Sequence, residues 1–317
     1  MLDKGSAVNT ENYRDQSAFI RLLGRLGMRN SRSFAIAMVI PTLIFMVIMT
    51  VYPMISTVFY SFTDFKLLKP DTDFIGLENF ISLFQNEYFR KAIWVTVKFT
   101  ALSVFFEMII GLLLALYVNS IQNRMIQKTM RITMLLPYLF PTVTVALSWS
   151  MMLSPNYGVV NQWLSTIGLP TFSWFADVAT AFPMLVVIDV WQNTPFVFLL
   201  IYAALQSIPQ DQYKAAMIDG AGTRNTFRYI TLPNLKTSLA LCALLRTIDT
   251  FRIFDKVNLL TGGGPANSTT TITQYIYNFG IKPLKFGLGS AGALIMTVLV
   301  LILAAIYIKN ALKSNPN

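Results

Sequence analysis

Six stretches of the chain are apolar over a length that can cross a lipid bilayer, and this feature limits the possible folds most strongly. A bilayer core requires about 20 mostly apolar residues in a helix. Hydrophobic residues make up 54% of the chain and charged residues only 13%, so neither a water-soluble domain nor a disordered chain fits. We therefore predict an all-α integral membrane protein. The six predicted spans are residues 34–62, 92–119, 130–153, 178–206, 237–259 and 286–308.

The distribution of Lys and Arg between these spans predicts the orientation of the chain. Cytoplasmic segments hold the excess of Lys and Arg. The side that carries both termini has fifteen of these residues in its segments, and the opposite side has six. Both termini are therefore predicted to be cytoplasmic. Because the basic residues lie mostly in short segments between apolar runs, the net charge of +10 points to membrane lipid and not to nucleic acid.

The domain organisation follows from the spans. Residues 1–33 form a predicted cytoplasmic tail, residues 34–309 the membrane domain, and residues 310–317 a second cytoplasmic tail. The first apolar run is far longer than a signal-peptide core, so we expect it to remain as a helix. Residues 19–26 mix apolar and basic side chains at helical spacing, which fits either a helix on the anionic inner leaflet or a poorly ordered tail.

Residue counts exclude several kinds of chemistry. The chain has no histidine and one cysteine, which excludes intrachain disulfides, zinc sites built from Cys and His, and His-dependent acid–base catalysis. We therefore predict no catalytic residues and no metal site. The sequence also contains no Gly-Lys dipeptide, so no Walker A loop for ATP can be written.

The loop at residues 207–236, between the fourth and fifth spans, is predicted to hold two short helices outside the bilayer. Pro209 suits the first turn of a helix, and Gly220 can adopt the left-handed conformation that ends one. A second helix is predicted over residues 223–231, with its first residue as the N-cap and Pro233 as its end. The small side chains of the first helix suit close docking of another protein, but composition alone favours an ordinary connection.

This loop resembles the EAA loop of ABC importer permeases. The likeness lies in Tyr213-Lys214-Ala215-Ala216 through Asp219-Gly220-Ala221, followed by Phe227, Ile230, Thr231, Leu232 and Pro233. Over about residues 34–309 the chain is similar to the carbohydrate-importing branch of that family, which includes the maltose permeases. The stretches that carry this likeness are Leu136-Pro137-Tyr138 with Pro141, Trp191 with Pro195-Phe196, and Leu260-Thr261-Gly262-Gly263-Gly264-Pro265.

The resemblance implies a type I importer permease of a bacterial inner membrane, whose loop inserts into a cleft of a cytoplasmic ATPase. The implied partners are a second permease subunit, two ATPase subunits that bind ATP and magnesium, an external solute-binding protein and an oligosaccharide; this chain itself would bind no cofactor. The family usually has Glu where this chain has Lys214, which predicts a carboxylate partner on the ATPase. The implied coupling residues are Tyr213, Lys214, Ala215, Ala216, Asp219, Gly220, Leu232 and Pro233.

Four charged residues recur every three positions along the predicted fifth span, with alternating sign. On a helix with 3.6 residues per turn such steps drift by about 60° each, so we do not expect all four to face one cavity. They fit ion pairs inside the bundle, a polar translocation cavity, or a position beyond the bilayer. The four are Arg246, Asp249, Arg252 and Asp255, and the stripe that does align is Arg246, Asp249, Thr250 and Ile253.

By their distance from the glycine run, these stripe residues fall about where related maltose permeases line their sugar site. Part of the fourth span resembles the opposite wall, although simple packing also explains Trp191. Because charges are unusual beside a neutral sugar, we hypothesise an acidic cargo, such as an alginate fragment, whose carboxylate pairs with Arg246 or Arg252. The implied substrate path comprises Asp189, Trp191, Gln192, Asn193, Phe196, Arg246, Asp249, Thr250, Arg252 and Ile253.

These features together predict a permease half that imports oligosaccharides by alternating access and performs no bond chemistry. A secondary sugar transporter driven by an ion gradient is the alternative, although the inverted repeats of many such proteins are not evident in the sequence. A membrane enzyme is a third possibility, and the sequence lacks a clustered acid–base or metal constellation that would favour it.

Overall fold

The computed structural model describes residues 31–69 and 71–313, and the regular secondary structure within them is helical, apart from one isolated bridge between Thr63 and Phe74. The predicted all-α class is confirmed. The N-terminal segment forms α2 (Ser31–Met46), a π-helical turn (Val47–Val51) and α3 (Tyr52–Ser61). The predicted membrane-surface helix at residues 19–26 lies outside the described residues.

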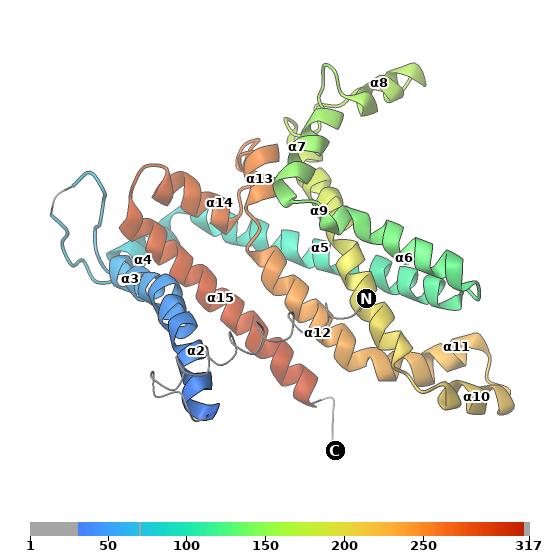
Figure 1. Cartoon of the computed structure of the whole chain (residues 1–317). Helices are drawn as coiled ribbons and strands as arrows, with labels where there is room; N and C mark the ends of the chain where they lie inside the picture. The colour runs from blue at the N-terminus through green and yellow to red at the C-terminus, as the bar shows by residue number, and fades with distance from the viewer. Residues whose placement is uncertain (1–30, 70, 314–317) are drawn as a thin grey trace, which may run out of the picture. The chain divides into compact units, whose positions relative to one another are not determined.

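Two long helices form the centre of the membrane domain (Figure 1). These are α5 (Glu87–Ser120), which follows the short α4 (Glu78–Gln85), and α9 (Val178–Gln206). The two helices approach closely at Gly111, where an added Cβ would lie 2.6 Å from Val197 Cγ1. Glycine therefore permits the contact between the two spans. The last span is α15 (Phe286–Lys313).

The predicted third span is not one straight helix. It consists of α6 (Arg124–Leu139) and α7 (Thr142–Met152), which meet at an angle of 89°. Pro141 lies in the break, and a proline lacks the N–H that would continue the helical hydrogen bonds. The chain then turns into the short α8 (Val159–Thr166), which lies beyond the end of α7 (Figure 1).

The predicted fifth span is also interrupted, and the prediction of one helix over residues 237–259 was wrong. Helix α12 (Leu232–Phe251) ends before Arg252, and the chain turns into α13 (Asp255–Leu260). Hydroxyl groups of Thr271 and Thr273 donate to the Ile253 carbonyl in this break. Tertiary hydrogen bonds thus supply partners that a continuous helix would have provided.

Three π-helical turns in the described residues share one sequence cause. They are Val47–Val51, Phe227–Thr231 and Tyr277–Ile281, the last after α14 (Ile272–Ile276), and each is followed two residues later by a proline. A proline has no N–H, and its ring clashes with the carbonyl four residues earlier, so a wider turn accommodates it. The prediction that Pro233 ends a helix was therefore wrong. The helix continues through Pro233 into α12.

The number of membrane spans stays a prediction. Among the described residues, four helices are long and apolar enough to cross a bilayer, namely Met38–Ser61, Glu87–Ser120, Val178–Gln206 and Phe286–Lys309, and the bent pair α6–α7 makes a fifth candidate. Helix α12 is outside this group; its 20 residues include Lys236, Arg246 and Asp249. The chain is thus a multi-pass membrane protein, and the cytoplasmic placement of its termini remains a prediction.

The loop between α3 and α4 is organised by a small charge cluster. The ammonium of Lys69 donates to Asp64 at 2.7 Å and to Asp73 at 3.0 Å, and the backbone N–H of Asp73 donates to the other oxygen of Asp64. The hydrogen bond from Lys69 and that from the Asp73 backbone lower the pKa of Asp64. Backbone hydrogen bonds from Leu67 to Leu284 and from Gly287 to Phe65 tie this loop to the start of α15.

Candidate functional site

The loop between α9 and α12 carries the short helix that the sequence predicted. Helix α10 runs over Gln210–Ile218, with Pro209 as its N-cap, and Gly220 has a φ of +71° just after its end. The following α11 (Thr223–Thr226) has Gly222 as its N-cap, and not Thr223 as predicted. Both short helices lie at the same end of the domain, where α9 ends and α12 begins (Figure 1).

Side-chain contacts hold α10 against the start of α12. The Tyr213 hydroxyl lies 3.1 Å from the Thr231 hydroxyl, and the Asn234 amide donates to Gln212 at 2.9 Å. Ala216 is buried and Ala215 is exposed, so only one of the two alanines lies on the inner face. The exposed part of α10 ends in two apolar side chains, because Met217 is 69% and Ile218 87% exposed.

Lys214 pairs with Asp211 of its own helix, at a distance of 3.0 Å. The two side chains are 67% and 90% exposed, and an exposed pair of this kind contributes about 0–1 kcal/mol to stability. The ammonium thus remains available to another carboxylate at little cost, and a partner on an ATPase subunit stays a prediction. The other predicted coupling residues also lie in this region: Asp219 is the C-cap of α10, and Leu232 and Pro233 are exposed at the start of α12.

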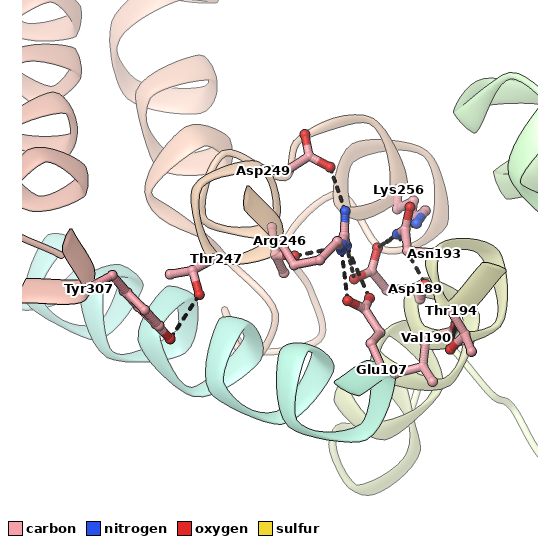
Figure 2. Close-up of polar contacts among 11 residues, drawn as sticks. Glu107, Asp189, Val190, Asn193, Thr194, Arg246, Thr247, Asp249, Lys256 and Tyr307 are labelled. Atoms are coloured by element: carbon pink, nitrogen blue, oxygen red, sulfur yellow. Dashed lines mark hydrogen bonds and ion pairs between the residues drawn. The ribbon is translucent and has the colours of Figure 1, made fainter. Parts of the chain in front are cut away.

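A network of buried charges lies where α5, α9, α12 and α13 converge (Figure 2). Arg246 of α12 donates from Nε to Glu107 Oε2 at 2.7 Å and from Nη2 to Glu107 Oε1 at 3.0 Å. The same guanidinium reaches Asp249 at 2.6 Å and the Thr250 hydroxyl at 2.9 Å. Asp189 of α9 lies 3.7 Å from Arg246 Nη2. Four side chains thus surround one guanidinium.

Asp189 has a second cationic partner in Lys256 of α13, at 2.5 Å. Asn193, one turn further along α9, donates to the same carboxylate oxygen at 2.9 Å. Glu107, Asp189, Arg246 and Lys256 are each at most 3% exposed. Glu107 and Lys256 were not among the residues predicted for the site, although charge within an apolar span is a signal that points to them.

Arg246, Asp249, Arg252 and Asp255 all line one cavity of about 150 Å³, together with Lys256, Asp189, Asn193, Thr250 and Ile253. The expectation that they could not share a cavity was wrong, because it assumed a continuous helix. Since α12 ends at Phe251, the chain turns and brings Arg252 and Asp255 back to the side on which Arg246 lies.

Three residues of the implied substrate path lie outside this cavity. Trp191 packs edge-on against Trp149, with ring centroids 5.6 Å apart, and Phe196 stacks on Tyr138 at 5.5 Å. Gln192 donates to the Phe140 carbonyl at 3.1 Å. Trp191 also lines a separate apolar cavity of about 760 Å³ between α5, α6 and α9. In the described state these three side chains face other parts of the domain.

The glycine run after α13 adopts backbone conformations that require glycine. Gly262 and Gly263 have φ values of +61° and +94°, where side chains are rarely tolerated. A Cβ on Gly263 would also lie 2.6 Å from the Thr270 hydroxyl oxygen, and that hydroxyl donates to the Gly263 carbonyl at 2.8 Å. The run is therefore a compact turn closed by threonine hydroxyl groups.

Comparisons with known proteins agree with this architecture. Residues 107–309 match the family described as binding-protein-dependent transport system inner membrane component. The trehalose/maltose transport system permease protein MalF of Thermococcus litoralis is 37% identical over 273 residues, which cover 86% of this chain and 91% of that protein. The sulfoquinovosyl glycerol transport system permease protein SmoG of Agrobacterium fabrum is 35% identical over 279 residues, which cover 88% of this chain and 90% of that protein.

A solved structure supports the same assignment. A bacterial alginate ABC transporter, in complex with an alginate pentasaccharide-bound periplasmic protein, contains a chain that is 27% identical and has a TM-score of 0.77. The match covers 90% of this chain and 96% of that one. The present chain therefore belongs to the family of binding-protein-dependent transport system inner membrane components, as a carbohydrate-type ABC importer permease.

Proposed function

We propose that this chain forms one permease half of an ATP-driven oligosaccharide importer that works by alternating access. Its partners in this proposal are a second permease subunit, two ATPase subunits that bind ATP and magnesium, and an external solute-binding protein. The observation that carries the proposal is the connection of α10 to both helices that supply the polar cavity. Helix α10 continues from α9 through a three-residue connection and contacts the start of α12 through Tyr213 and Gln212.

This connection gives α10 a mechanical role. An ATPase that binds the exposed face of α10 and moves it would also displace the adjoining ends of α9 and α12. Asp189 and Asn193 lie on α9, and Arg246 and Thr250 lie on α12, so a relative movement of the two helices changes the width of the cavity between them. The coupling residues thus act on the substrate path through two helices, and not through direct contact with cargo.

The sugar class follows from the relatives and from the chemistry of the cavity. Carboxylate, amide, guanidinium and hydroxyl groups line it, and these groups exchange hydrogen bonds readily with sugar hydroxyls. One relative is named as a trehalose/maltose transport permease, and the similar solved structure is an alginate transporter. Both neutral and acidic oligosaccharides are therefore candidate cargo, and the charged side chains of the cavity determine which of the two is preferred.

For an acidic cargo, Arg252 is the better of the two candidate cations. Arg246 is already surrounded by Glu107, Asp189 and Asp249. Arg252 is exposed, lines the same cavity, and makes no ion pair within the part of the chain that the structure describes. A carboxylate of the cargo would find its charge partner in Arg252 without displacing a buried ion pair.

The proposal is tested with the complete assembly reconstituted in vesicles with its binding protein. ATP-dependent uptake of an oligosaccharide, unchanged when ion gradients are abolished, is the expected result; uptake that follows an ion gradient overturns it. In the same vesicles, Arg252→Gln should reduce uptake of acidic oligosaccharides about tenfold or more and leave neutral ones unchanged. Arg124→Gln, at the exposed start of α6, is the matched control, and equal effects of Arg252→Gln on both cargo classes would reject the acidic preference.

A further inference from the structure

The buried charges do more than line the cavity, because they join four helices of the bundle. Glu107 is on α5, Asp189 on α9, Arg246 on α12 and Lys256 on α13, and Figure 2 shows their side chains converging on one point. The hydrogen bond between Thr247 and Tyr307, at 3.2 Å, adds α15 to this assembly. Contacts between residues as far apart as 139 positions hold the spans together here.

The cavity beside these contacts, which residues of α7, α9, α12 and α13 line, is too small to hold the proposed cargo. Its volume is about 150 Å³, whereas small-molecule pockets start at about 300 Å³. A charged group of the cargo can meet Arg252 at the exposed edge of the cavity, but an oligosaccharide can pass between the helices only after α12 and α13 move away from α5 and α9. The described structure therefore leaves no passage between these helices, and the ion pairs are the contacts that must separate before one can form.

Separation of these ion pairs requires replacement partners. A buried charge that loses its partner is strongly unfavourable unless water or another polar group takes that place. One buried carboxylate oxygen already lacks a hydrogen-bond donor: Asp189 Oδ2 accepts no hydrogen bond from the described residues. Water and cargo hydroxyl groups are the polar groups that can enter when the helices part, so opening and occupancy by polar molecules depend on each other.

The charge network also lies at matching distances from α10, here called the docking helix, along α9 and along α12. Asp189 is 17 residues before the end of α9, and Arg246 is 15 residues after Thr231. At 1.5 Å per residue these segments are about 25 Å and about 22 Å long. The docking helix and the charge network are thus connected by both α9 and α12. A displacement of α10 is therefore transmitted along these two helices to the ion pairs.

We propose that Glu107, Asp189, Arg246 and Lys256 form an ionic latch that keeps the translocation path closed until docking-helix movement and polar molecules act together. Glu107 and Lys256 are positioning residues in this scheme, since they hold Arg246 and Asp189 and need not touch cargo. The inference rests on the proposed function, and it deepens it by naming the contacts that prevent opening without cargo.

The first test is the accessibility of the cavity in the assembled transporter. A cysteine is placed at Thr142, which lines the cavity, in a Cys242→Ala background, and its reaction with a small polar thiol reagent is timed without ATP and without cargo. Glu107→Gln should accelerate the reaction about tenfold. Glu87→Gln, the same substitution in the exposed first turn of α5, should leave the rate unchanged.

ATPase activity supplies the second readout. A latch that opens too easily should raise cargo-independent ATPase activity and reduce its stimulation by loaded binding protein, both in Glu107→Gln and in Lys256→Met. A purely structural role would instead lower the amount of assembled complex without changing either ratio per complex. Equal accessibility of residue 142 in the Glu107→Gln and Glu87→Gln complexes would overturn the latch. Because accessibility is measured without transport, that result is distinct from a failure of the proposed import function.

Discussion

The guanidinium of Arg246 and the carboxylate of Glu107 meet through two hydrogen bonds, of 2.7 Å and 3.0 Å, although the residues are 139 positions apart. The parallel geometry matches the planar fork of a guanidinium to the two oxygens of a carboxylate. It fixes α12 against α5 in the interior of the bundle. Replacement of either residue by a neutral one leaves the charge of the other residue buried.

Substitution of Arg246 should destabilise the domain more than substitution of Glu107. Arg246→Met leaves Glu107, Asp189 and Asp249 without their shared cation, and breaking a buried ion pair costs about 3–5 kcal/mol. Glu107→Gln keeps an oxygen acceptor toward Arg246, which retains two other carboxylates, so we expect about 1–3 kcal/mol. The thermal midpoint of the purified protein in detergent should fall in this order.

The matched control for both variants is Glu87→Gln, which removes an exposed carboxylate from the same helix as Glu107. Its free energy of unfolding should match that of the unmodified protein within about 0.5 kcal/mol, so its thermal midpoint should hardly change. A midpoint for Arg246→Met that equals this control would mean that the guanidinium is not held as the structure shows.

Lys214 offers a prediction about the ATPase interface. The exposed pair with Asp211 contributes little to α10 itself, so Lys214→Gln should leave the folding of the permease unchanged. If an ATPase carboxylate binds Lys214, as the sequence predicts, the variant should weaken ATPase binding about threefold to tenfold at low salt and less at high salt. Titration of ATPase subunits onto immobilised permease at two ionic strengths measures this effect.

Asp211→Asn is the partner substitution in that experiment. It releases Lys214 from its own helix, so it should leave ATPase binding unchanged or strengthen it. Weaker binding in both variants would indicate that the intrahelical pair itself, and not a contact of Lys214 with the ATPase, is recognised.

The sequence was sufficient to predict elements whose signal is local. Hydropathy located α5, α9 and α15 close to their observed bounds, and Pro209 and Gly220 correctly bracketed α10. These predictions succeeded because bilayer length, proline at a helix start and glycine at a helix end each act within a few residues of the chain. The likeness in the loop and the glycine run was specific enough to identify the family.

Features that depend on distant contacts could not be predicted in the same way. Whether Pro233 ends a helix or is absorbed by a π-helical turn depends on how the helix packs beyond it, and both outcomes are compatible with the residues around it. The end of α12 at Phe251 involves hydroxyl groups of Thr271 and Thr273, some twenty positions later. The grouping of Arg252 and Asp255 with Arg246 followed from that break, so a helical-wheel argument could not find it.

The charge cluster in the loop after α3 should be lost at acidic pH and should remain intact at neutral pH. The pKa of Asp64 is lowered from its ordinary value of 3.8, first by the hydrogen bond from Lys69. A lowered carboxyl pKa means that the contribution of the cluster is complete above the ordinary value and is lost as the pH falls through the lowered value. The same carboxylates raise the pKa of Lys69, so the cluster should remain intact throughout the neutral range.

Hydrogen exchange of the Asp73 amide, which donates to Asp64, reports on this cluster. The ratio of exchange rates between Asp64→Asn and the unmodified protein cancels the intrinsic pH dependence of exchange. The ratio should be large near neutral pH and approach one as the carboxylate becomes protonated at acidic pH. A ratio of one at neutral pH would show that Asp64 does not hold the loop.

Two positions of the glycine run, compared with Gly222 in the loop before α11, provide a graded test of backbone strain by Gly→Ala substitution. Gly222 has a φ of −70° and open space around a new Cβ, so Gly222→Ala should change stability by less than about 1 kcal/mol. Gly262→Ala adds a positive φ of +61° without a clash and should cost about 1–2 kcal/mol. Gly263→Ala combines a φ of +94° with a Cβ only 2.6 Å from the Thr270 hydroxyl oxygen, so it should cost most, about 2–4 kcal/mol.

Thermal midpoints of the three variants should therefore fall in the order Gly222, Gly262, Gly263. A second substitution separates the two causes at Gly263. Thr270→Ala removes the clashing oxygen and also the hydrogen bond to the Gly263 carbonyl, so it should destabilise the parent protein but lessen the additional effect of Gly263→Ala. If the two substitutions were simply additive, the clash would contribute nothing and the positive φ alone would explain why glycine occupies this turn.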